Sequence, residues 1–395
     1  MVNNRLGGYA LAIDGDLDVL ALGELLVHLI ATRVGTLADT PGFTREPGGA
    51  AANVATGVAR LGRRAAVLGL VGDDPFGRYL VRALSGYGVE TRYIGVHPRG
   101  HTPVAFVSRS ELDHTPDEPG AAADADAAPG AAQFVFYREG GADQLWSPAT
   151  VPEAAVQRAR IVVGSGVALA RALPRAALHA GFALAADAGA LVAFDVNWWP
   201  GLWQNPERAR DFYHALLPQV DILKLSSAEL IMLTGGAASS EVSRLDALLH
   251  AWVGRLVAGR QRPLLVALTR GPAGCTYGLW RPGRRSMEVT HLAACDVAVK
   301  DRTGAGDAFF AGLLVAVLDR LAPATNSSPV TGDPQSAIRN PQSALDLSRL
   351  SLADVAVCFT WANASGALAT TRQGAIAGLP ARSNVLRLIK GQRTP

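Results

Sequence analysis

The amino-acid sequence predicts an α/β fold in which a mostly parallel central sheet is flanked by helices on both faces. Apolar runs of strand length recur along the chain, and stretches with helical spacing lie between several of them. The runs are apolar at nearly every position, which is typical of parallel strands buried on both faces. Because ligands of such sheets bind beyond the carboxyl ends of the strands, a functional site is expected at that edge.

The predicted elements follow one another in a regular order. Central strands are expected at residues 19–23, 65–72, 160–166, 191–197, 221–226 and 263–271. Helical spacing runs through residues 169–190, 246–259 and 307–318. Two more strand-like runs, 102–110 and 133–141, would form a hairpin if the segment between them were short.

Two segments interrupt this order. Residues 111–132 contain six acidic and no basic residues, and predict a long, disordered hairpin tip. Residues 323–351 contain the near-repeat PQSAIRN and PQSALDL, and predict a disordered surface insertion. Inert loops are expected, with a regulatory role as the alternative. Tails are expected over residues 1–17 and 391–395, on either side of one domain from 18 to 390.

Composition argues against several classes of function. The 37 basic and 34 acidic residues are scattered and give a net charge of +3, so no nucleic-acid partner is expected. Cys275, Cys295 and Cys358 are odd in number and far apart, which predicts reduced thiols rather than disulfides or a zinc site. Acidic residues at positions 14, 16 and 18 interrupt the first apolar stretch. A cytoplasmic protein without a membrane partner is therefore expected.

The stretch KDRTGAGDAFFAGLL, residues 300–314, predicts an anion pocket at the start of a helix. The backbone N–H groups of Gly304, Ala305 and Gly306 would face an anion, helped by the positive end of the helix. Asp307 falls in the first helical turn. A simple helix cap is the alternative for Asp307, but a cap does not require a Gly-Ala-Gly turn before it.

The same residues, DRTGAGD, resemble the second signature of the PfkB, or ribokinase-like, sugar kinase family. That signature usually reads D-T-T-G-A-G-D, and Arg302 stands in place of its first Thr. PGGAAANVATGVARLG, residues 47–62, is similar to the family's N-terminal signature. Further resemblances follow in family order and cover most of residues 18–390: LGELLV, FVFYREGGADQLWSP, FDVNWWPGLW, DILKLSSAEL, ALTRGPAG and WANASGALATTRQGAIAGLP.

The resemblance implies a ribokinase-like three-layer fold with a small β-sheet lid, built from strands near residues 25–30, 42–47, 102–108 and 133–138. It implies ATP-dependent phosphorylation of a sugar hydroxyl beneath the lid, which excludes water when it closes. The fructokinase-like branch makes fructose or a similar ketose the first expectation. Alternatives are 2-keto-3-deoxygluconate, another sugar or a nucleoside, and, from another class, a non-catalytic binding or scaffold protein. A homodimer through the lid is also implied.

The resemblance assigns catalytic roles to two motifs. Asp307 corresponds to the base that takes the proton of the attacking hydroxyl, and the amides of residues 304–306 stabilise the transferring phosphoryl group. Ser226 and Glu229 fall on the family's N-x-x-E motif, whose Glu orders Mg²⁺ and water near the phosphates of ATP. Ser226 replaces the Asn of that motif. A solvated helix residue is the alternative for Glu229.

Two further segments correspond to the nucleotide site. Thr269, Gly271 and Gly274 match the loop that touches the phosphates and ribose of ATP, with a plain turn as the alternative. Asn363 and Gly366 match the helix that borders the adenine, with ordinary helix packing as the alternative.

A monovalent cation site is the third implied feature. Asp301 and Thr303 resemble its start, and the loop near Ala369, Arg372 and Gly374 would complete it. Backbone carbonyl oxygens dominate such sites, so sequence specifies them poorly. Binding of K⁺ is therefore left open at this point.

On the sugar side, Gly48, Gly49 and Asn53 match the glycine pair and the Asn that approach sugar hydroxyls, with a turn entering a helix as the alternative. Arg138 lies where some relatives place an Arg over the substrate, with a solvated lid residue as the alternative.

Two departures from the family pattern limit the prediction of the sugar. His28 replaces an Asp that usually contacts sugar hydroxyls, and an imidazole cannot accept two vicinal hydroxyls as a carboxylate does. Trp199 replaces an Arg that acid-sugar kinases use near a carboxylate. This replacement argues against an acid sugar, although Arg138 could compensate. Trp199 is expected either to stack on a sugar ring or to pack against protein.

Overall fold

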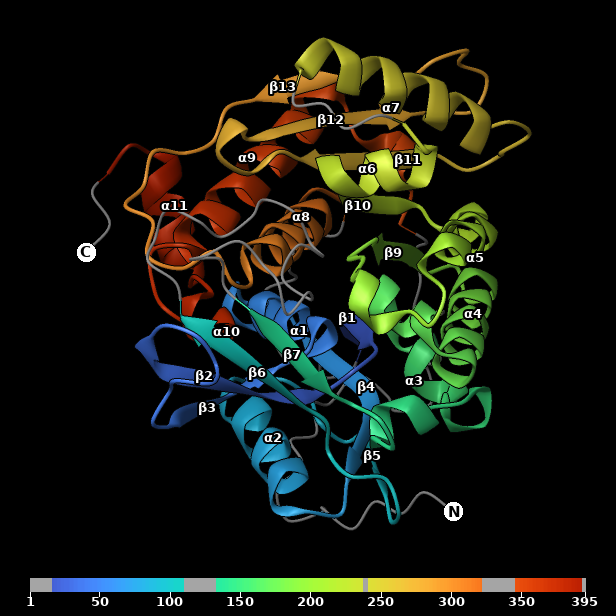
Figure 1. The fold of residues 1–395 in the computed structure, drawn as a ribbon. Coiled ribbons are helices and arrows are strands. Elements are labelled where there is room, and N and C mark those ends of the chain that lie inside the picture. Colours follow the sequence, from blue (N-terminus) through green and yellow to red (C-terminus); the bar gives the residue numbers. More distant parts are fainter. Residues whose placement is uncertain (1–15, 110–132, 237–240, 322–344, 393–395) are drawn as a thin grey trace, which may run out of the picture.

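A nine-stranded sheet forms the centre of the molecule, which is described here by a computed structural model covering residues 16–109, 133–236, 241–321 and 345–392 (Figure 1). Its strand order is β13-β12-β11-β10-β9-β8-β1-β4-β5, parallel from β11 to β5, with β12 and β13 antiparallel at one edge. The strands are β1 (Leu17–Leu22), β4 (Ala65–Gly72), β5 (Ile94–His97), β8 (Ala159–Ser165), β9 (Leu191–Asp195), β10 (Ile222–Ser226), β11 (Leu264–Thr269), β12 (Cys275–Trp280) and β13 (Thr290–Leu292).

Helices cover both faces of this sheet, as the apolar strands predict. They are α1 (Ala50–Arg60), α2 (Pro75–Gly86), α3 (Glu153–Gln157), α4 (Ala172–Asp187), α5 (Ala209–Leu216), α6 (Ser227–Thr234), α7 (Val242–Leu256), α8 (Ala305–Leu321), α9 (Leu352–Ala369), α10 (Ala375–Gly378) and α11 (Arg382–Ile389). Short 3₁₀ helices are η1 (Ala142–Leu145), η2 (Pro148–Thr150), η3 (Gly166–Ala170), η4 (Pro200–Leu202), η5 (Pro206–Arg208), η6 (Leu217–Gln219), η7 (Gly271–Ala273) and η8 (Leu347–Arg349).

Two apolar cores lie on opposite faces of the sheet because successive side chains of a strand alternate. In β1, Val19 and Ala21 belong to the core beneath α1, α2, α8 and α9, whereas Leu20 and Leu22 belong to the core beneath α3 to α7. The three-layer α/β fold expected from the sequence is confirmed.

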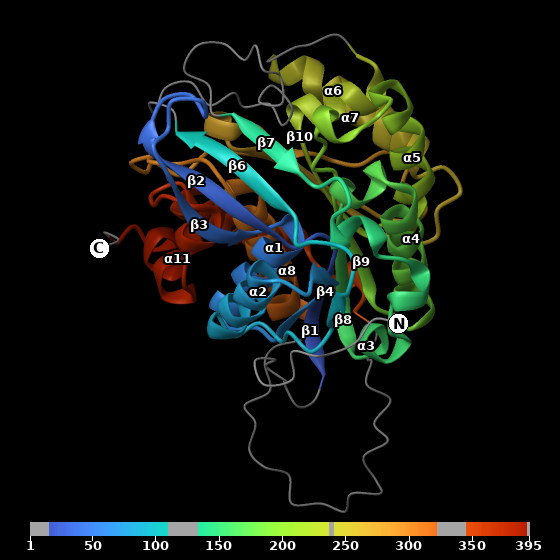
Figure 2. The same cartoon turned by 60° about the horizontal axis from the view of Figure 1, so that its bottom comes forward.

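A separate four-stranded sheet lies beside the main one (Figure 2). Its order is β3-β2-β6-β7, formed by β2 (Leu26–Val34), β3 (Phe43–Gly48), β6 (Val104–Arg109) and β7 (Phe134–Tyr137). We call it the lid sheet. One of its faces carries an aromatic row, in which Phe106 contacts Phe43 and Tyr137 at ring distances of 5.1 and 5.2 Å.

Two of the sequence-based boundaries change. The predicted surface insertion 323–351 is wrong for its last seven residues, because Leu345, Leu347 and Leu350 are buried in the core. Burial of these three apolar side chains stabilises the segment, although most residues around them are polar. The predicted tail 1–17 also extends too far, because β1 begins at Leu17. The predicted insertion 111–132, and residues 323–344 of the other one, lie outside the described residues.

One described helix, α9, is long and apolar enough to cross a membrane, and 61% of that apolar window is buried within the protein. Its packing explains the composition, because a methyl group on Gly312 of α8 would lie 2.5 Å from Oγ of Ser365 in α9. The two helices therefore touch closely within one core.

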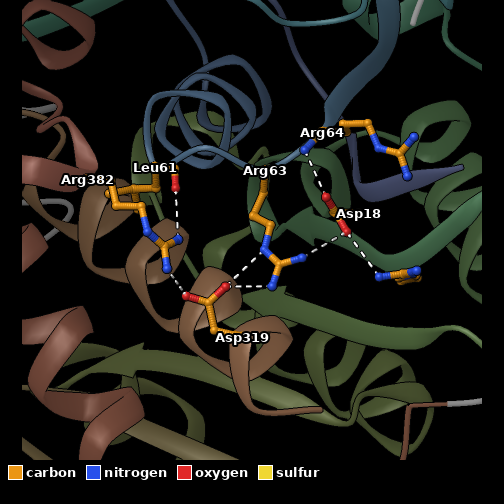
Figure 3. A network of polar contacts seen from close by, with 7 residues as sticks. Asp18, Leu61, Arg63, Arg64, Asp319 and Arg382 are labelled. Carbon is orange, nitrogen blue, oxygen red and sulfur yellow. Dashed lines mark hydrogen bonds and ion pairs between the residues drawn. The ribbon is translucent and has the colours of Figure 1, made fainter. Parts of the chain in front are cut away.

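A network of ion pairs ties the ends of several elements together, far along the chain from one another (Figure 3). Asp319, near the end of α8, accepts hydrogen bonds from Nε of Arg63 at 3.0 Å and from Nη2 of Arg382 at 2.5 Å. Arg63 also pairs with Asp18 of β1 at 3.5 Å, and its side chain is only 4% exposed. The network thus joins α8, α11, β1 and the turn before β4.

Replacing Asp319 by Asn should lower the free energy of unfolding by about 2–3 kcal/mol, because the buried Arg63 guanidinium loses its closest carboxylate. Urea unfolding measures this. Arg320→Ala is the matched control: its ion pair with Asp354 is exposed, so the loss should stay below about 1 kcal/mol. Equal losses in the two variants would contradict a structural role for the network.

Candidate active site

Acidic and polar side chains gather where the carboxyl ends of the central strands meet the start of α8. β1 lies between β4 and β8, so later strands of the chain are added on one side of β1 and then on the other. In folds of this type, ligands bind at the carboxyl ends of the strands where the strand order reverses in this way. A small cavity of about 10 Å³ lies there, lined by Leu22, Ala50, Ala51, Val54, Val163, Gly164, Ser165, Asp195, Asp307 and Phe310. Two carboxylates, Asp195 and Asp307, therefore share one small space.

The turn before α8 and the first residues of that helix carry the backbone donors of the predicted anion pocket. Gly304 adopts a φ of 78°, which favours glycine, and α8 starts at Ala305. The N–H of Ala305 donates to the carbonyl of Arg302 at 3.1 Å. Within the described residues, the N–H groups of Gly304 and Gly306 have no backbone acceptor. The predicted anion pocket thus keeps two of its three donors, while the Ala305 amide closes the turn.

Asp307 is held by a residue from another helix. Nδ2 of Asn53 in α1 donates to Oδ2 of Asp307 at 2.8 Å. The helices approach closely because Gly57 has no side chain: a methyl group there would lie 2.6 Å from Cβ of Ala311 in α8. Burial, and then the Asp195 carboxylate, raise the pKa of Asp307 to about 7, against the opposing effects of Asn53 and Lys224. A carboxylate with this pKa can take up a proton near neutral pH.

A buried lysine lies beneath the anion pocket. Nζ of Lys224 in β10 pairs with the carboxylate of Asp195 at 2.9 Å, and both side chains are less than 10% exposed. A methyl group on Gly306 would lie 3.0 Å from this Nζ. Burial lowers the pKa of Lys224, but Asp195 and Glu229 outweigh that effect and raise it, so the ammonium group is charged. A cation is therefore fixed beside Gly306.

Glu229 is completely buried at the start of α6. Its Oε2 accepts from the N–H of Ser226 at 2.6 Å, and its Oε1 accepts from the N–H of Trp198 at 2.9 Å. Ser226 Oγ accepts in turn from the N–H of Glu229, which completes a capping box. The alternative of a solvated helix residue is therefore wrong. The S-x-x-E spacing has a structural reason, and the carboxylate keeps acceptor capacity beyond these two bonds.

The predicted cation loop comes together around Asp301. Its Oδ1 accepts from the N–H of Thr303 and its Oδ2 from the N–H of Gly374, both at 2.8 Å. The N–H of Asp301 donates to the carbonyl of Thr370 at 3.1 Å. Thus the loop after α9 and the turn before α8 are bonded to each other. Among the residues the structure covers, no group of three His, Cys, Asp or Glu side chains is arranged to hold a metal.

The residues predicted to contact nucleotide lie on two neighbouring segments. Thr269 ends β11, and Gly271 and Gly274, with φ of 52° and 85°, form the turn into β12. Nδ2 of Asn363 in α9 donates to the carbonyl of Ala293 at 2.6 Å. Asn363 therefore joins α9 to the segment after β13. Gly366 permits close packing on the start of α8, since a methyl group there would lie 3.2 Å from the carbonyl oxygen of Ala305.

On the lid side, the glycine pair is enclosed by protein. A methyl group on Gly48 would lie 2.5 Å from Cε1 of His28, and one on Gly49 would lie 2.3 Å from the carbonyl oxygen of Glu24. His28 is buried, and this burial lowers its pKa to about 4, so the imidazole is neutral at physiological pH. Glu24 accepts from the N–H of Ala50 at 2.6 Å, and burial raises its pKa.

Arg138 and Trp199 are both committed to protein contacts. Nε of Arg138 donates to Oδ2 of Asp143 at 2.7 Å, and both residues are buried. The indole of Trp199 lies 5.3 Å from the ring of Phe134 and 5.5 Å from that of Phe136, both in β7. The structure therefore agrees with the second expectation for Trp199, which is packing against protein.

Comparison with known proteins places this geometry in a family. Residues 16–382 match the pfkB family carbohydrate kinase model. The chain is a pfkB family carbohydrate kinase. It is 32% identical to fructokinase-1 of Oryza sativa subsp. japonica over 375 residues, which are 94% of this chain and 97% of the rice protein.

Solved structures agree with this assignment. The kinase superposes on the fructokinase from Xylella fastidiosa with bound ATP with a TM-score of 0.71 and 29% identity, covering 95% of this chain and 98% of that one. It superposes on a double mutant of the fructokinase from Vibrio cholerae O395, in fructose-, ADP- and potassium-bound form, with a TM-score of 0.70 and 25% identity, covering 95% and 100%. The ribokinase-like fold expected from the sequence is confirmed.

Sequence reasoning missed three charged residues of this kinase: Glu24, Asp195 and Lys224. A signal was present for two of them, because Asp195 and Lys224 interrupt strands that are otherwise apolar, and charges are almost never fully buried unless they are paired. Glu24 comes just after β1, beyond Gly23, at the strand edge where a site was expected. Asp195 ends β9, whereas Lys224 lies in the middle of β10.

Proposed function

We propose that this carbohydrate kinase phosphorylates a hydroxyl of fructose or a similar ketose with ATP. Asp307 acts as the general base, and the backbone N–H groups of Gly304 and Gly306 stabilise the transferring phosphoryl group. The observation that carries the proposal is geometric: the Asp307 carboxylate lies in the first turn of α8, directly after the N–H groups of Gly304 and Gly306, which have no backbone acceptor among the described residues. Phosphoryl transfer needs chiefly such positioning and charge neutralisation.

The sugar side favours a neutral substrate over 2-keto-3-deoxygluconate. An acid sugar would require a cation to receive its carboxylate. Arg138 is instead paired with Asp143, and Trp199 packs against the lid. Likeness to fructokinases of rice, Xylella and Vibrio supports a ketose. His28 and Gly48 are proposed to border it from the lid sheet, and Gly49 and Asn53 from the start of α1.

A panel assay tests the substrate. ATP consumption is measured with ketoses, aldoses, acid sugars and nucleosides under one set of conditions. We expect turnover with fructose, and weak or no turnover with 2-keto-3-deoxygluconate. Preference for the acid sugar would overturn the substrate proposal alone. Absence of turnover with every compound, together with absence of ATP binding, would support the alternative of a non-catalytic binding protein.

For the nucleotide, we propose that Thr269, Gly271 and Gly274 approach the phosphates and ribose of ATP, and that Asn363 borders the adenine. Mg²⁺ is proposed to arrive on the phosphates of ATP, as is usual for this ion. Ser226 and Glu229 would contact it through water, using the acceptor capacity that their capping box leaves.

Dependence on K⁺ is a further prediction. Asp301 and Thr303 are proposed to bind the cation together with backbone carbonyl oxygens of the loop near Ala369, Arg372 and Gly374, which is hydrogen-bonded to Asp301. Replacing K⁺ by the bulky tetramethylammonium ion at equal ionic strength should lower kcat severalfold. Rates are compared at saturating ATP and sugar. An unchanged kcat would argue against a cation at this loop.

We propose that the kinase forms a homodimer through the exposed face of the lid sheet. Val135 is 41% and Tyr137 is 59% exposed there, beside Phe106 and Phe43. Exposed apolar patches of this kind mark interaction surfaces. Val135→Glu with Tyr137→Glu should shift the mass in solution from dimer to monomer, as read by light scattering. Leu386→Glu, at an exposed apolar residue of α11, is the control. A wild-type monomer would refute the dimer.

The cytoplasmic location stays a prediction from the sequence.

A further inference from the structure

An aromatic cluster joins the lid sheet to the loop that follows β9. Trp199 contacts Phe134 and Phe136 at ring distances of 5.3 and 5.5 Å, and the two phenyl rings stack at 6.4 Å. We call these three residues the aromatic clasp. They come from parts of the chain about sixty residues apart, and all three are half-buried. His28, on β2 of the lid sheet, also meets Phe134, at 6.4 Å.

The main-domain half of the clasp is held rigidly. Nε1 of Trp199 donates to Oδ1 of Asn197 at 2.8 Å. Asn197 has a φ of 36°, the one positive φ among the described residues other than glycine. The N–H of Trp198 is fixed by Glu229 at 2.9 Å. Such local strain persists only where surrounding contacts determine it, so the indole is presented to the lid in one direction.

The same loop continues into the catalytic residues. It begins after Asp195, the last residue of β9, whose carboxylate pairs with Lys224. Lys224 lies against Gly306, one residue before Asp307. Covalent links and direct contacts therefore run from β7 of the lid, through Trp199 and Asp195, to the anion pocket.

We propose that Trp199 is a positioning residue that holds β7 of the lid closed over the sugar. This inference rests on the proposed sugar kinase activity. A closed lid contributes binding energy for the sugar and excludes water from the phosphoryl group. Each aromatic pair adds to this closure beyond the area it buries. Loss of the clasp leaves the anion pocket and Asp307 in place but lets the lid open.

Trp199→Ala should therefore raise KM for the sugar about tenfold with a smaller change in kcat, and should increase ATP hydrolysis in the absence of sugar. Trp199→Phe should restore most of the wild-type KM, because it keeps an aromatic contact. Trp203→Ala is the matched control: that indole, in the same loop, packs on Phe212 and Tyr213 of the main domain, so KM should not change.

A readout independent of turnover separates this inference from the proposed function. Hydrogen–deuterium exchange of residues 134–137 should be faster in Trp199→Ala than in the wild type, and unchanged in Trp203→Ala. Phe134→Leu with Phe136→Leu tests the clasp from the lid side, should Trp199→Ala fail to fold. Wild-type exchange and wild-type KM in folded Trp199→Ala would overturn the proposal. If the wild type lacks turnover, the function fails, and exchange alone then decides the clasp.

Discussion

Replacement of Asp307 by Asn is expected to lower kcat by about 10²–10⁴-fold, the usual cost of losing a general base. The amide keeps the size of the carboxylate and can still meet Asn53, so the helix start and the ATP site should remain intact. The measurement is steady-state turnover of fructose, together with ATP affinity. A large loss of kcat with nearly unchanged ATP affinity is the expected result.

The pH dependence of kcat/KM is a second test of the role of Asp307. Asp307 must be ionised to accept a proton, and its pKa is raised to about 7. The value of kcat/KM should therefore rise about tenfold per pH unit below about pH 7 and level off above it. Asp195→Asn should move the rise to lower pH, because the Asp195 carboxylate raises the pKa of Asp307.

Asp296→Asn serves as the control for the first experiment. Asp296 is exposed and lies in the segment before α8, so the same chemical change there should leave kcat and its pH profile unaltered. If Asp307→Asn retained wild-type turnover, another group would have to be the base. If the wild-type profile were flat between about pH 6 and 8, the environment assigned to Asp307 would be wrong.

What the sequence predicts well is local. The strand at residues 65–72 is apolar throughout and coincides with β4, and the residues around 304–307 form the expected turn and helix start. Both depend on short-range rules: the period of apolar residues and the freedom of glycine. Composition and the near-repeat, rather than these rules, led to the error at Leu345 and Leu347, where the polar residues around them predicted a surface insertion but the two side chains are buried.

What the sequence predicts poorly depends on contacts between distant segments. Motif resemblance singled out Trp199 and Glu229, yet Trp199 packs on the β7 phenylalanines and Glu229 accepts a hydrogen bond from the N–H of Trp198, both from outside the motif concerned. Spacing within a motif does not show such partners. Each partner changes what the residue can offer to a ligand, since an indole packed on protein, or a carboxylate that already accepts two hydrogen bonds, has less of its surface or acceptor capacity left for one.

The second large effect is expected at Lys224. Lys224→Met should lower the free energy of unfolding by about 3–5 kcal/mol, because it leaves the Asp195 carboxylate buried without its cation. Lys390→Met is the matched control, since that lysine is exposed and its loss should cost less than about 0.5 kcal/mol. Urea unfolding of the two variants gives the comparison.

A double variant separates the contribution of the Lys224–Asp195 ion pair to stability from the contribution of side-chain packing. Lys224→Met combined with Asp195→Asn removes both charges, so it should recover part of the stability that Lys224→Met loses. Turnover should not recover, because the cation beside Gly306 is still missing. Lys224 also lowers the pKa of Asp307, so whatever activity Lys224→Met retains should rise with pH at a higher pH than in the wild type. A double variant no more stable than Lys224→Met would mean that packing, rather than the ion pair, holds this part of the site together.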